Sequence, residues 1–310
     1  MRVLLFGGSG LLGTELTAHL AERRIEFLAP SRAQVDCRDF QQVSRSIDSF
    51  RPSAVIVAAA RVGGIAANLR HGAEYLFDNA MINLITLRAC AEAGVPQAMV
   101  FGGSCLYPCG LERPIREDDF LQGPLEKTSE GYAIGKIAGA KYAEFLNRLG
   151  RCRAILCVPT SLYGDRDRFD AQEGHLVSSL IVKMHQAKEE GRGEVELWGD
   201  GSPRRDFLHA SDAARACLAI LEAPEVPWMI NVGTGEDLTV REIAEKVAQA
   251  VGFRGRIRFG GQFPNGTRRK LLNNDRIRAL GWEPRVPLEE GLRRTYRSFL
   301  TQREAEAVTK

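Results

Sequence analysis

Tyr132 and Lys136 are the two residues of this sequence whose types and spacing most directly indicate chemistry. They are four residues apart, so a helix places both side chains on one face, a turn from each other. An ammonium group beside a phenol favours the phenolate, and it is therefore expected to lower the pKa of Tyr132. Such a phenol can give a proton to, or take one from, a hydroxyl or carbonyl group of a sugar.

A glycine-rich turn near the N-terminus gives this pair its context. The apolar segment Arg2–Phe6 is predicted to be a buried strand of a parallel sheet, and a helical pattern follows at Thr14–Arg23. A turn between a strand and a helix brings backbone close to a pyrophosphate and points helix amides at it. No Lys-Ser/Thr pair follows, so a nucleoside triphosphate loop is not supported. The residues expected to bind a dinucleotide are Gly7, Gly8, Ser9, Gly10, Leu11, Leu12 and Gly13.

The second predicted strand, Ile25–Leu28, indicates which dinucleotide is bound. Such a strand ends near the adenosine ribose, where an NAD enzyme usually has an acidic residue to accept a hydrogen bond from the 2′-hydroxyl. Here the strand runs into Ala29-Pro30-Ser31-Arg32. Because a hydroxyl and a guanidinium suit a 2′-phosphate, the sequence predicts NADP(H) rather than NAD, with Arg32 as a contact.

Alternating strands and helices predict the fold. Further apolar runs indicate strands at 54–59, 97–102 and 153–158, and helical patterns cover 74–94 and 132–149. Successive βα units of this length predict an α/β protein with a Rossmann-type doubly wound parallel sheet. Ligands in such folds bind beyond the carboxyl ends of the strands. The segments that fall there are Gly7–Gly13, Ala58–Asn68, Gly103–Pro108 and Pro159–Gly164.

Composition and charge argue against several classes of protein. The chain has 310 residues, of which 44% are hydrophobic and 26% charged, as in ordinary globular proteins. A net charge of +3 is too small to predict nucleic acid binding. Seven cysteines at irregular spacing predict neither a disulfide framework nor a metal site, and they favour a reducing cytoplasm. The apolar stretch Val3–Phe6 is interrupted at once by glycines, so no signal peptide or membrane span is predicted.

Over nearly its whole length the chain resembles the extended short-chain dehydrogenase/reductase superfamily and, within it, the GDP-L-fucose synthase family. Gly7–Gly13 and Tyr132–Lys136 are common to the superfamily. The more specific segments are Ala58–Asn68, Ser104–Pro108, His175 in its helical run, and Pro264–Leu272. Pro159–Gly164, Arg205–His209 and Asn231–Gly235 complete the likeness.

The resemblance implies a two-stage conversion of GDP-4-keto-6-deoxy-D-mannose to GDP-L-fucose. The 4-keto group acidifies the protons on carbons 3 and 5. In the family a cysteine and a histidine, which correspond to Cys105 and His175, remove a proton from one face of the ring and return one to the other. NADPH then delivers hydride to carbon 4 while Tyr132, beside Lys136, supplies the proton. A helix N-terminus or a nearby cation would raise the thiolate fraction of Cys105.

The resemblance also assigns binding residues and lobes. Further cofactor contacts are implied at Ala59, Ala60, Gly102, Gly103, Tyr132, Lys136, Pro159, Thr160, Ser161, Leu162 and His175, and substrate contacts at Lys183, Trp198, Arg205, Asn265 and Lys270. Each lysine alone is more typical of a solvated surface, but the turn-rich run 199–207 is expected to deliver Arg204 and Arg205 to one loop. Residues 1–164 with 209–235 would form the NADP-binding Rossmann domain. Residues 165–208 with 236–310 would form a smaller, interleaved nucleotide-sugar lobe. Relatives of this kind pair as homodimers through the helices at 74–94 and 132–149.

Gly103 is the main departure from the family's pattern, which has a serine there that donates to the oxygen on carbon 4. Loss of such a donor costs about 2–4 kcal/mol in the reaction barrier. Ser104 can replace it if the backbone shifts, a water can substitute while Tyr132 carries more of the work, or the reductive step is weakened. Ser161 and Arg61 stand where asparagine and lysine are more usual.

Other functions therefore stay open beside the leading one. One is a GDP-sugar 3,5-epimerase without net reduction; relatives of that kind tend to have a lysine at the position of His175. Another is a GDP-4-keto-sugar reductase in which Cys105 and His175 are idle. A third is a non-catalytic NADP-binding protein, which Gly103 favours and the intact Tyr132 and Lys136 oppose.

Overall fold

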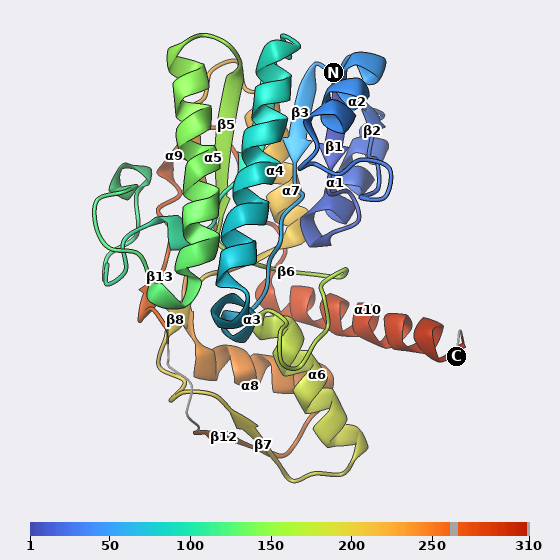
Figure 1. The fold of residues 1–310 in the computed structure, drawn as a ribbon. Coiled ribbons are helices and arrows are strands. Elements are labelled where there is room, and N and C mark those ends of the chain that lie inside the picture. Colours follow the sequence, from blue (N-terminus) through green and yellow to red (C-terminus); the bar gives the residue numbers. More distant parts are fainter. Residues whose placement is uncertain (261–265, 309–310) are drawn as a thin grey trace.

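The chain forms a large α/β lobe with a smaller lobe beside one end of its sheet (Figure 1). The computed structural model describes residues 1–260 and 266–308. The central sheet has six parallel strands in the order β10-β5-β4-β3-β1-β2. Their bounds are β1 Arg2–Phe6, β2 Glu26–Leu28, β3 Ala54–Val57, β4 Gln97–Phe101, β5 Arg153–Pro159 and β10 Met229–Val232. The chain runs outward from β1 to β2 and then returns to β3, so the predicted doubly wound sheet is confirmed, with its switch point between β1 and β3.

Helices cover both faces of this sheet. On one side lie α1 (Leu11–Glu22) and α7 (Ala210–Glu222), and on the other α2 (Phe40–Phe50), α4 (Gly72–Glu92) and α5 (Glu130–Arg148). Alternate residues of β1 supply the two cores: Val3 and Leu5 pack with α1 and α7, whereas Leu4 and Phe6 pack against the α2–α4–α5 side. This alternation is what a strand buried on both faces requires.

The helices α4 and α5 pack against each other unusually closely (Figure 1). A β-carbon added at Gly135 of α5 would lie 2.6 Å from the carbonyl oxygen of Leu76 in α4, and one at Gly139 would lie 2.4 Å from Cβ of Asn83. No side chain fits at such distances, so glycine is required at both positions. Since α5 carries Tyr132 and Lys136, this contact fixes the position of both residues along the helix axis and the direction in which the helix presents them.

The smaller lobe has an apolar core of its own. It is built by α6 (Leu176–Glu189), α8 (Val240–Val251) and α10 (Leu288–Val308), with β7 (Glu194–Leu197) paired to β12 (Arg256–Phe259). The remaining elements are short. The strands are β6 Ser161–Tyr163, β8 Arg204–Arg205, β9 Phe207–His209, β11 Leu238–Thr239 and β13 Arg269–Lys270. The helices are α3 Ile65–Arg70 and α9 Asp275–Arg278, and the 3-10 turns are η1 Ser104–Leu106, η2 Glu117–Asp119 and η3 Lys127–Ser129.

Most predicted element ends agree with the structure to within two residues. The helix expected at Thr14 begins earlier, at Leu11, because Gly10 already serves as its N-cap. Leu272, Ile277 and Trp282 pack into the two cores of the large lobe, so the chain returns to the sheet once more after the smaller lobe has begun. Within the described ranges, none of the helices is long and apolar enough to cross a membrane.

Candidate functional site

The turn between β1 and α1 has the shape of a dinucleotide cradle. Gly7 adopts φ +87°, and a β-carbon there would lie 2.3 Å from the amide nitrogen of Ala59. A β-carbon at Gly13 would lie 2.0 Å from the carbonyl oxygen of Gly7. Gly10 is the N-cap of α1 and makes no side-chain cap, so the first amides of the helix stay open to an anion. The residues present therefore fit a bound pyrophosphate.

The segment after β2 bears on the choice of cofactor. Ser31 and Arg32 are exposed there, as the sequence suggested. The nearby carboxylate of Asp36 is held by Arg38 at 2.7 Å, and this hydrogen bond is the main reason that the pKa of Asp36 falls to about 2. Arg38 also reaches Asp78 of α4 at 2.8 Å. The first acidic group that follows β2 in the sequence is thus already engaged by a guanidinium.

Tyr132 and Lys136 lie on one face of α5, with Nζ of Lys136 5.9 Å from the centre of the Tyr132 ring. Lys136 is 1% exposed, and burial lowers its pKa to about 8. Among the described residues, no hydrogen-bond partner meets its Nζ. A buried ammonium without an acceptor is costly. Ribose hydroxyls of a bound dinucleotide are acceptors of the required kind, so Lys136 also fits the cofactor that the glycine turn suits.

The expected lowering of the Tyr132 pKa is wrong for this structure. Burial of the phenol is the largest influence and raises its pKa, and the neighbouring Cys105 raises it further. Lys136 is itself displaced toward its neutral form by burial, so it offers less charge to offset that cost. In the unliganded protein Tyr132 is therefore a protonated donor, which suits delivery of a proton to a carbonyl oxygen.

Cys105 lies in η1, directly after β4, and is 8% exposed. A β-carbon added at Gly103 would lie 3.7 Å from its Sγ and 4.0 Å from Oη of Tyr132, so thiol and phenol border one small space. Burial raises the pKa of the thiol, while Lys270 and Lys136 act to lower it. The predicted cations are thus present, yet burial outweighs them.

The end of the η1 segment is tied to the sheet. Oη of Tyr107, which is buried, donates a 2.5 Å hydrogen bond to Oδ1 of Asn231 in β10. The backbone amide of Asn231 donates to the carboxylate of Glu117, and its side-chain Nδ2 donates to the carbonyl oxygen of Ile115. This network holds the Ser104–Pro108 segment against the carboxyl end of β10 and so fixes where Cys105 lies.

His175 is the N-cap of α6 and is partly exposed. Its carbonyl oxygen accepts from Oγ of Ser178 at 3.1 Å. The loop before it is joined to the Ala58–Asn68 segment, because the amide of Gly64 donates to the carbonyl oxygen of Glu173 at 3.0 Å. A β-carbon at Gly64 would lie 2.7 Å from the carbonyl oxygen of Gly174. Two of the four segments that are more specific to the resemblance, Ala58–Asn68 and the run around His175, therefore pack against each other.

Arg205 and Lys270 face each other across the short β8–β13 ladder. Burial lowers the pKa of Arg205 to about 10, with Glu126 opposing the shift, and burial also lowers the pKa of Lys270. Two neighbouring, partly buried cations with one nearby carboxylate form a site for an anion such as a diphosphate.

The expectation that Arg204 and Arg205 share one loop facing a ligand is corrected by the same ladder. They form a strand, and successive strand residues point to opposite sides. Arg204 and its ladder partner Arg269 both bind the carboxylate of Asp237, the first at 2.9 Å, so both guanidinium groups are engaged within the protein. Of the four basic residues of this ladder, Arg205 and Lys270 on the opposite side remain available to a ligand.

The remaining predicted positions are placed as follows. Nζ of Lys183 lies 4.8 Å from the Trp198 ring centre, a cation–π contact that brings these two predicted residues together. Asn265 lies outside the described residues. Ala59 and Ala60 follow β3, Gly102 and Ser104 flank Gly103 after β4, and Pro159, Thr160, Ser161 and Leu162 follow each other from β5 into β6.

Two residues near this site were not predicted. Glu126 caps η3, since its carboxylate accepts from the amide and hydroxyl of Thr128, and its charge acts on Arg205, Lys270 and Cys105. Asp206, fully buried, accepts from the amide and hydroxyl of Thr234. The only signal in the sequence was its place inside the Arg205–His209 segment, because the neighbouring residues do not show whether a carboxylate is buried.

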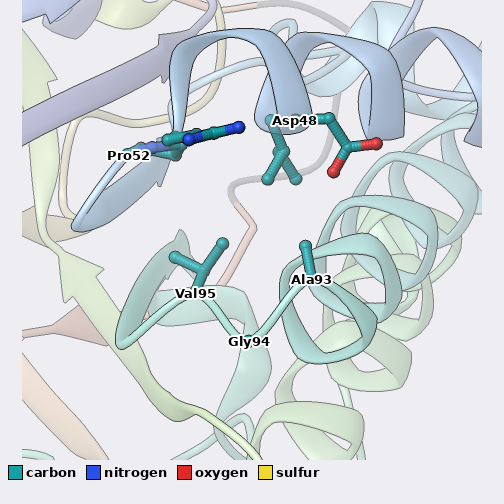
Figure 2. Close-up of a pocket in the computed structure, with 7 residues that line it drawn as sticks. Asp48, Pro52, Ala93, Gly94 and Val95 are labelled. Carbon is teal, nitrogen blue, oxygen red and sulfur yellow. The ribbon is translucent and has the colours of Figure 1, made fainter.

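A surface cavity of about 540 Å³ lies elsewhere, at the amino ends of β3 and β4 (Figure 2). It is lined by Ile47, Asp48, Arg51, Pro52, Ala93, Gly94 and Val95. Because the predicted residues follow the carboxyl ends of the strands, this cavity opens at the opposite edge of the sheet and contains none of them. Across the described ranges, no group of three histidine, cysteine or acidic side chains is placed to hold a metal ion.

Comparison with known proteins agrees with this geometry. The model of the NAD dependent epimerase/dehydratase family matches residues 3–233. GDP-L-fucose synthase of Sinorhizobium fredii (strain NBRC 101917 / NGR234) is 37% identical, with 97% of this chain and 96% of the relative covered. The Escherichia coli (strain K12) enzyme of the same name is 38% identical, with 96% of each covered. Among solved structures, the GDP-mannoheptose C4 reductase MlghC of Campylobacter jejuni, with NADP bound, is 27% identical at a TM-score of 0.88, covering 96% of this chain and 98% of that one.

Proposed function

The chain belongs to the NAD dependent epimerase/dehydratase family and, within it, to the GDP-L-fucose synthase family, and we propose that it converts GDP-4-keto-6-deoxy-D-mannose to GDP-L-fucose. It is an NADP-dependent enzyme that acts on a nucleotide sugar. The observation that most supports the specific reaction is the small space at Gly103, which the thiol of Cys105 and the phenol of Tyr132 border together.

NADP(H) is the cofactor, and this chain's residues suit it in three places. The open amides after Gly10 receive the pyrophosphate, Arg32 is available to a 2′-phosphate, and Lys136 donates to the nicotinamide ribose. When bound, NADPH supplies the hydride that reduces carbon 4. Gly102, Ala59 and the Pro159–Leu162 segment line the carboxyl edge of the sheet along which a dinucleotide of this length extends.

Epimerisation is assigned to Cys105 and His175. The 4-keto group makes the protons on carbons 3 and 5 acidic, so one group removes a proton and a second returns one to the opposite face. Cys105 is proposed as the base because it stands at the position of the family's cysteine. Lys270 and Lys136 favour its thiolate, although burial still raises the pKa of the thiol in the unliganded protein. His175 then protonates the other face of the ring. Inversion at carbon requires two groups on opposite sides, which two separate lobes are suited to provide.

Reduction is assigned to Tyr132. As hydride arrives at carbon 4, the negative charge that develops on the keto oxygen takes the phenolic proton. The high pKa of the buried phenol keeps that proton in place until the charge appears. Lys136 stabilises the phenolate that forms, from its position one helical turn further along α5.

The GDP part of the substrate is assigned to the smaller lobe. Arg205 and Lys270 are proposed to bind the diphosphate, since the other two cations of the same ladder, Arg204 and Arg269, are bound to Asp237. Lys183 and Trp198, which contact each other, are proposed as further substrate contacts, and Asn265 completes the proposed set. In this division residues 1–164 with 209–235 hold the cofactor, and residues 165–208 with 236–310 hold the sugar nucleotide.

A related GDP-4-keto-sugar reductase or 3,5-epimerase is the second candidate, and Gly103 is the observation that favours it. Without a serine there, Tyr132 carries the proton transfer without a second donor at the keto oxygen. Ser104, which is partly exposed at the start of η1, is the replacement that lies nearest in the chain.

The protein is also proposed to work as a homodimer in the cytoplasm. Apolar side chains are exposed on α4 and α5, among them Phe77 at 59%, Phe145 at 49% and Ile134 at 40%. Such a face on two adjacent helices is suited to pairing with its own copy. All seven cysteines are free thiols, as a reducing compartment favours.

Purified protein is expected to oxidise NADPH when given GDP-4-keto-6-deoxymannose, with GDP-L-fucose as the product identified by mass and NMR. Deuterated water separates the steps: deuterium should enter carbons 3 and 5, and Cys105→Ser should abolish that incorporation. If NADPH absorbance stays constant at saturating substrate, the reductase assignment is wrong. If Cys105→Ser exchanges at the full rate, another residue is the base.

A further inference from the structure

The loop between β6 and α6 folds back on itself and brings Asp167 to the start of α6. The amide of Asp167 donates to the carbonyl oxygen of Gly164 at 3.3 Å. The amide of Gly174 donates to the backbone carbonyl oxygen of Asp170 at 3.2 Å. A β-carbon at Gly174 would lie 3.2 Å from both the carbonyl oxygen of Arg168 and Oγ of Ser178. The backbone next to Asp167 therefore packs directly on the first turn of the helix that His175 caps.

Asp167 is a buried carboxylate with one unused oxygen. The residue is 5% exposed, and Oδ1 accepts a 2.8 Å hydrogen bond from the amide of Arg168. Within residues 1–260 and 266–308, Oδ2 has no hydrogen-bond partner. A buried carboxylate oxygen without a donor is expensive, so an unsatisfied one in a folded protein indicates a partner that is supplied in another state.

The other acidic side chains of this loop are already engaged. Asp165 pairs with Arg294 at 3.4 Å through Oδ2, and its Oδ1, which accepts no hydrogen bond within the described residues, lies 3.6 Å from Nε2 of His209. Asp170 accepts from the amides of Gln172 and Glu173, both at 2.8 Å. Glu173 binds Arg70 at 2.9 Å and Arg168 at 3.3 Å. Asp167 differs from them in being buried and without a cationic partner at hydrogen-bond distance.

The charged group whose field acts on Asp167 is His175. Burial raises the pKa of Asp167, and His175 acts in the opposite direction. Arg168 contributes its backbone amide, while its guanidinium reaches Glu173 and Asp170 instead. Ser178 lies next to both groups, and its hydroxyl already donates to the carbonyl oxygen of His175. The Ser178 hydroxyl also acts on the Asp167 carboxylate and lowers its pKa, whereas His175 is the side chain whose charge acts on it.

We propose that Asp167 is the positioning residue of His175, with Oδ2 accepting one imidazole N–H so that the other ring nitrogen faces the sugar. The inference rests on the proposed function, in which His175 protonates the ring. A carboxylate on one nitrogen fixes the tautomer and the orientation of the ring and stabilises the imidazolium. The second N–H gives its proton to the carbon that Cys105 has deprotonated from the other face. The neutral imidazole that remains still donates to Asp167, so the pair is ready to be reprotonated.

The test combines a spectroscopic signal with isotope exchange, using the full-length protein. In protein labelled with ¹⁵N-histidine, His175 is expected to show a downfield imidazole proton, assigned by its absence in His175→Gln. Asp167→Asn keeps an acceptor but removes the charge, and Asp167→Leu removes both. The proton should move upfield in the first variant and vanish in the second. Deuterium incorporation into the sugar should fall roughly ten- to a hundredfold while KM for the GDP-sugar changes little.

Asp165→Asn is the matched control, because it changes a carboxylate of the same loop that binds His209 and Arg294 instead. It should leave the His175 proton in place. An unchanged signal and exchange rate in Asp167→Asn would overturn the inference. If Asp167→Leu does not fold, Asp167→Asn alone decides, with circular dichroism as the check on folding. If His175→Gln keeps full exchange, the proposed role of His175 fails instead, and the imidazole signal still reports whether the pair exists.

Discussion

The position of Gly103 leaves room for the side chain that the family usually carries there. Its φ is −170°, an extended conformation open to any residue, and an added β-carbon would meet Cys105, its nearest neighbour, at 3.7 Å. Neither strain nor a clash therefore explains the glycine. A serine hydroxyl at this position would stand beside Oη of Tyr132, where a second donor to the keto oxygen is useful.

Gly103→Ser is therefore expected to raise the rate of NADPH oxidation about tenfold or more, because one preorganised donor is restored at the reacting oxygen. Steady-state kinetics with GDP-4-keto-6-deoxymannose measures this. Ser104→Ala serves as the companion variant. An unchanged rate in Gly103→Ser together with a large loss in Ser104→Ala would show that Ser104 already fills the role.

Lys136 predicts a pH dependence of stability. Its folded pKa is about 8, against 10.5 for the ordinary side chain, so between these values the unfolded chain binds more protons and the free energy of unfolding rises with pH. The cost of burying the charge, about 3 kcal/mol, is fully present below pH 8 and is relieved above 10.5. Urea denaturation of the unliganded protein should show wild type gaining this amount over Lys136→Met across that window. An equal difference between the two proteins at both ends would contradict the buried ammonium.

The individual residues show where sequence reasoning stops. The spacing of Tyr132 and Lys136 was enough to place them on one face of a helix, and motif context was enough to single out Cys105. The direction of the Tyr132 pKa shift was wrong, because burial is a property of the packed site and outweighs a neighbouring charge. Asp167 was not found at all, since nothing in the run around it distinguishes a buried aspartate from a surface one.

At the scale of elements, the closeness of α4 and α5 decides where the reactive residues lie. Gly135→Ala would put a β-carbon 2.6 Å from the backbone of Leu76. The helices must then separate, and a loss of about 2–3 kcal/mol in the free energy of unfolding is expected, with slower NADPH oxidation because α5 carries Tyr132. Gly72→Ala on α4 is the control, as its β-carbon meets nothing within 4 Å and should change stability by less than about 0.5 kcal/mol. Equal effects of the two substitutions would mean that the close contact is not limiting.

Strands and long helices were predictable because their apolar periodicity is local. The carboxyl ends of β1, β3, β4 and β5 were placed to within two residues, and with them the edge at which the site lies. The small β8–β13 ladder was not predicted, because two-residue strands have no periodicity. This is why the run 199–207 was expected to deliver Arg204 and Arg205 to one loop rather than to a strand.

For the whole molecule, the exposed apolar face of α4 and α5 predicts assembly. Phe77→Glu should convert a dimer to a monomer in analytical ultracentrifugation, because a charge is placed in the proposed apolar contact. Leu121→Glu, which changes an apolar residue exposed at 45% outside these helices, should leave the mass unchanged. A wild-type protein that sediments as a monomer at micromolar concentration would end the dimer proposal.

The pairing of β13 with β8 has a consequence for how this lobe can vary among related chains. Each of the two strands carries two adjacent basic residues. The register of the pairing alone decides which pair lies on the side of Asp237, Arg204 with Arg269, and which lies on the other side, Arg205 with Lys270. A shift by a single residue would turn Arg269 toward the diphosphate and Lys270 toward Asp237, with no change in composition or net charge. The proposed recognition of the diphosphate therefore depends on the register of β8 and β13 and not on the number of positive charges alone.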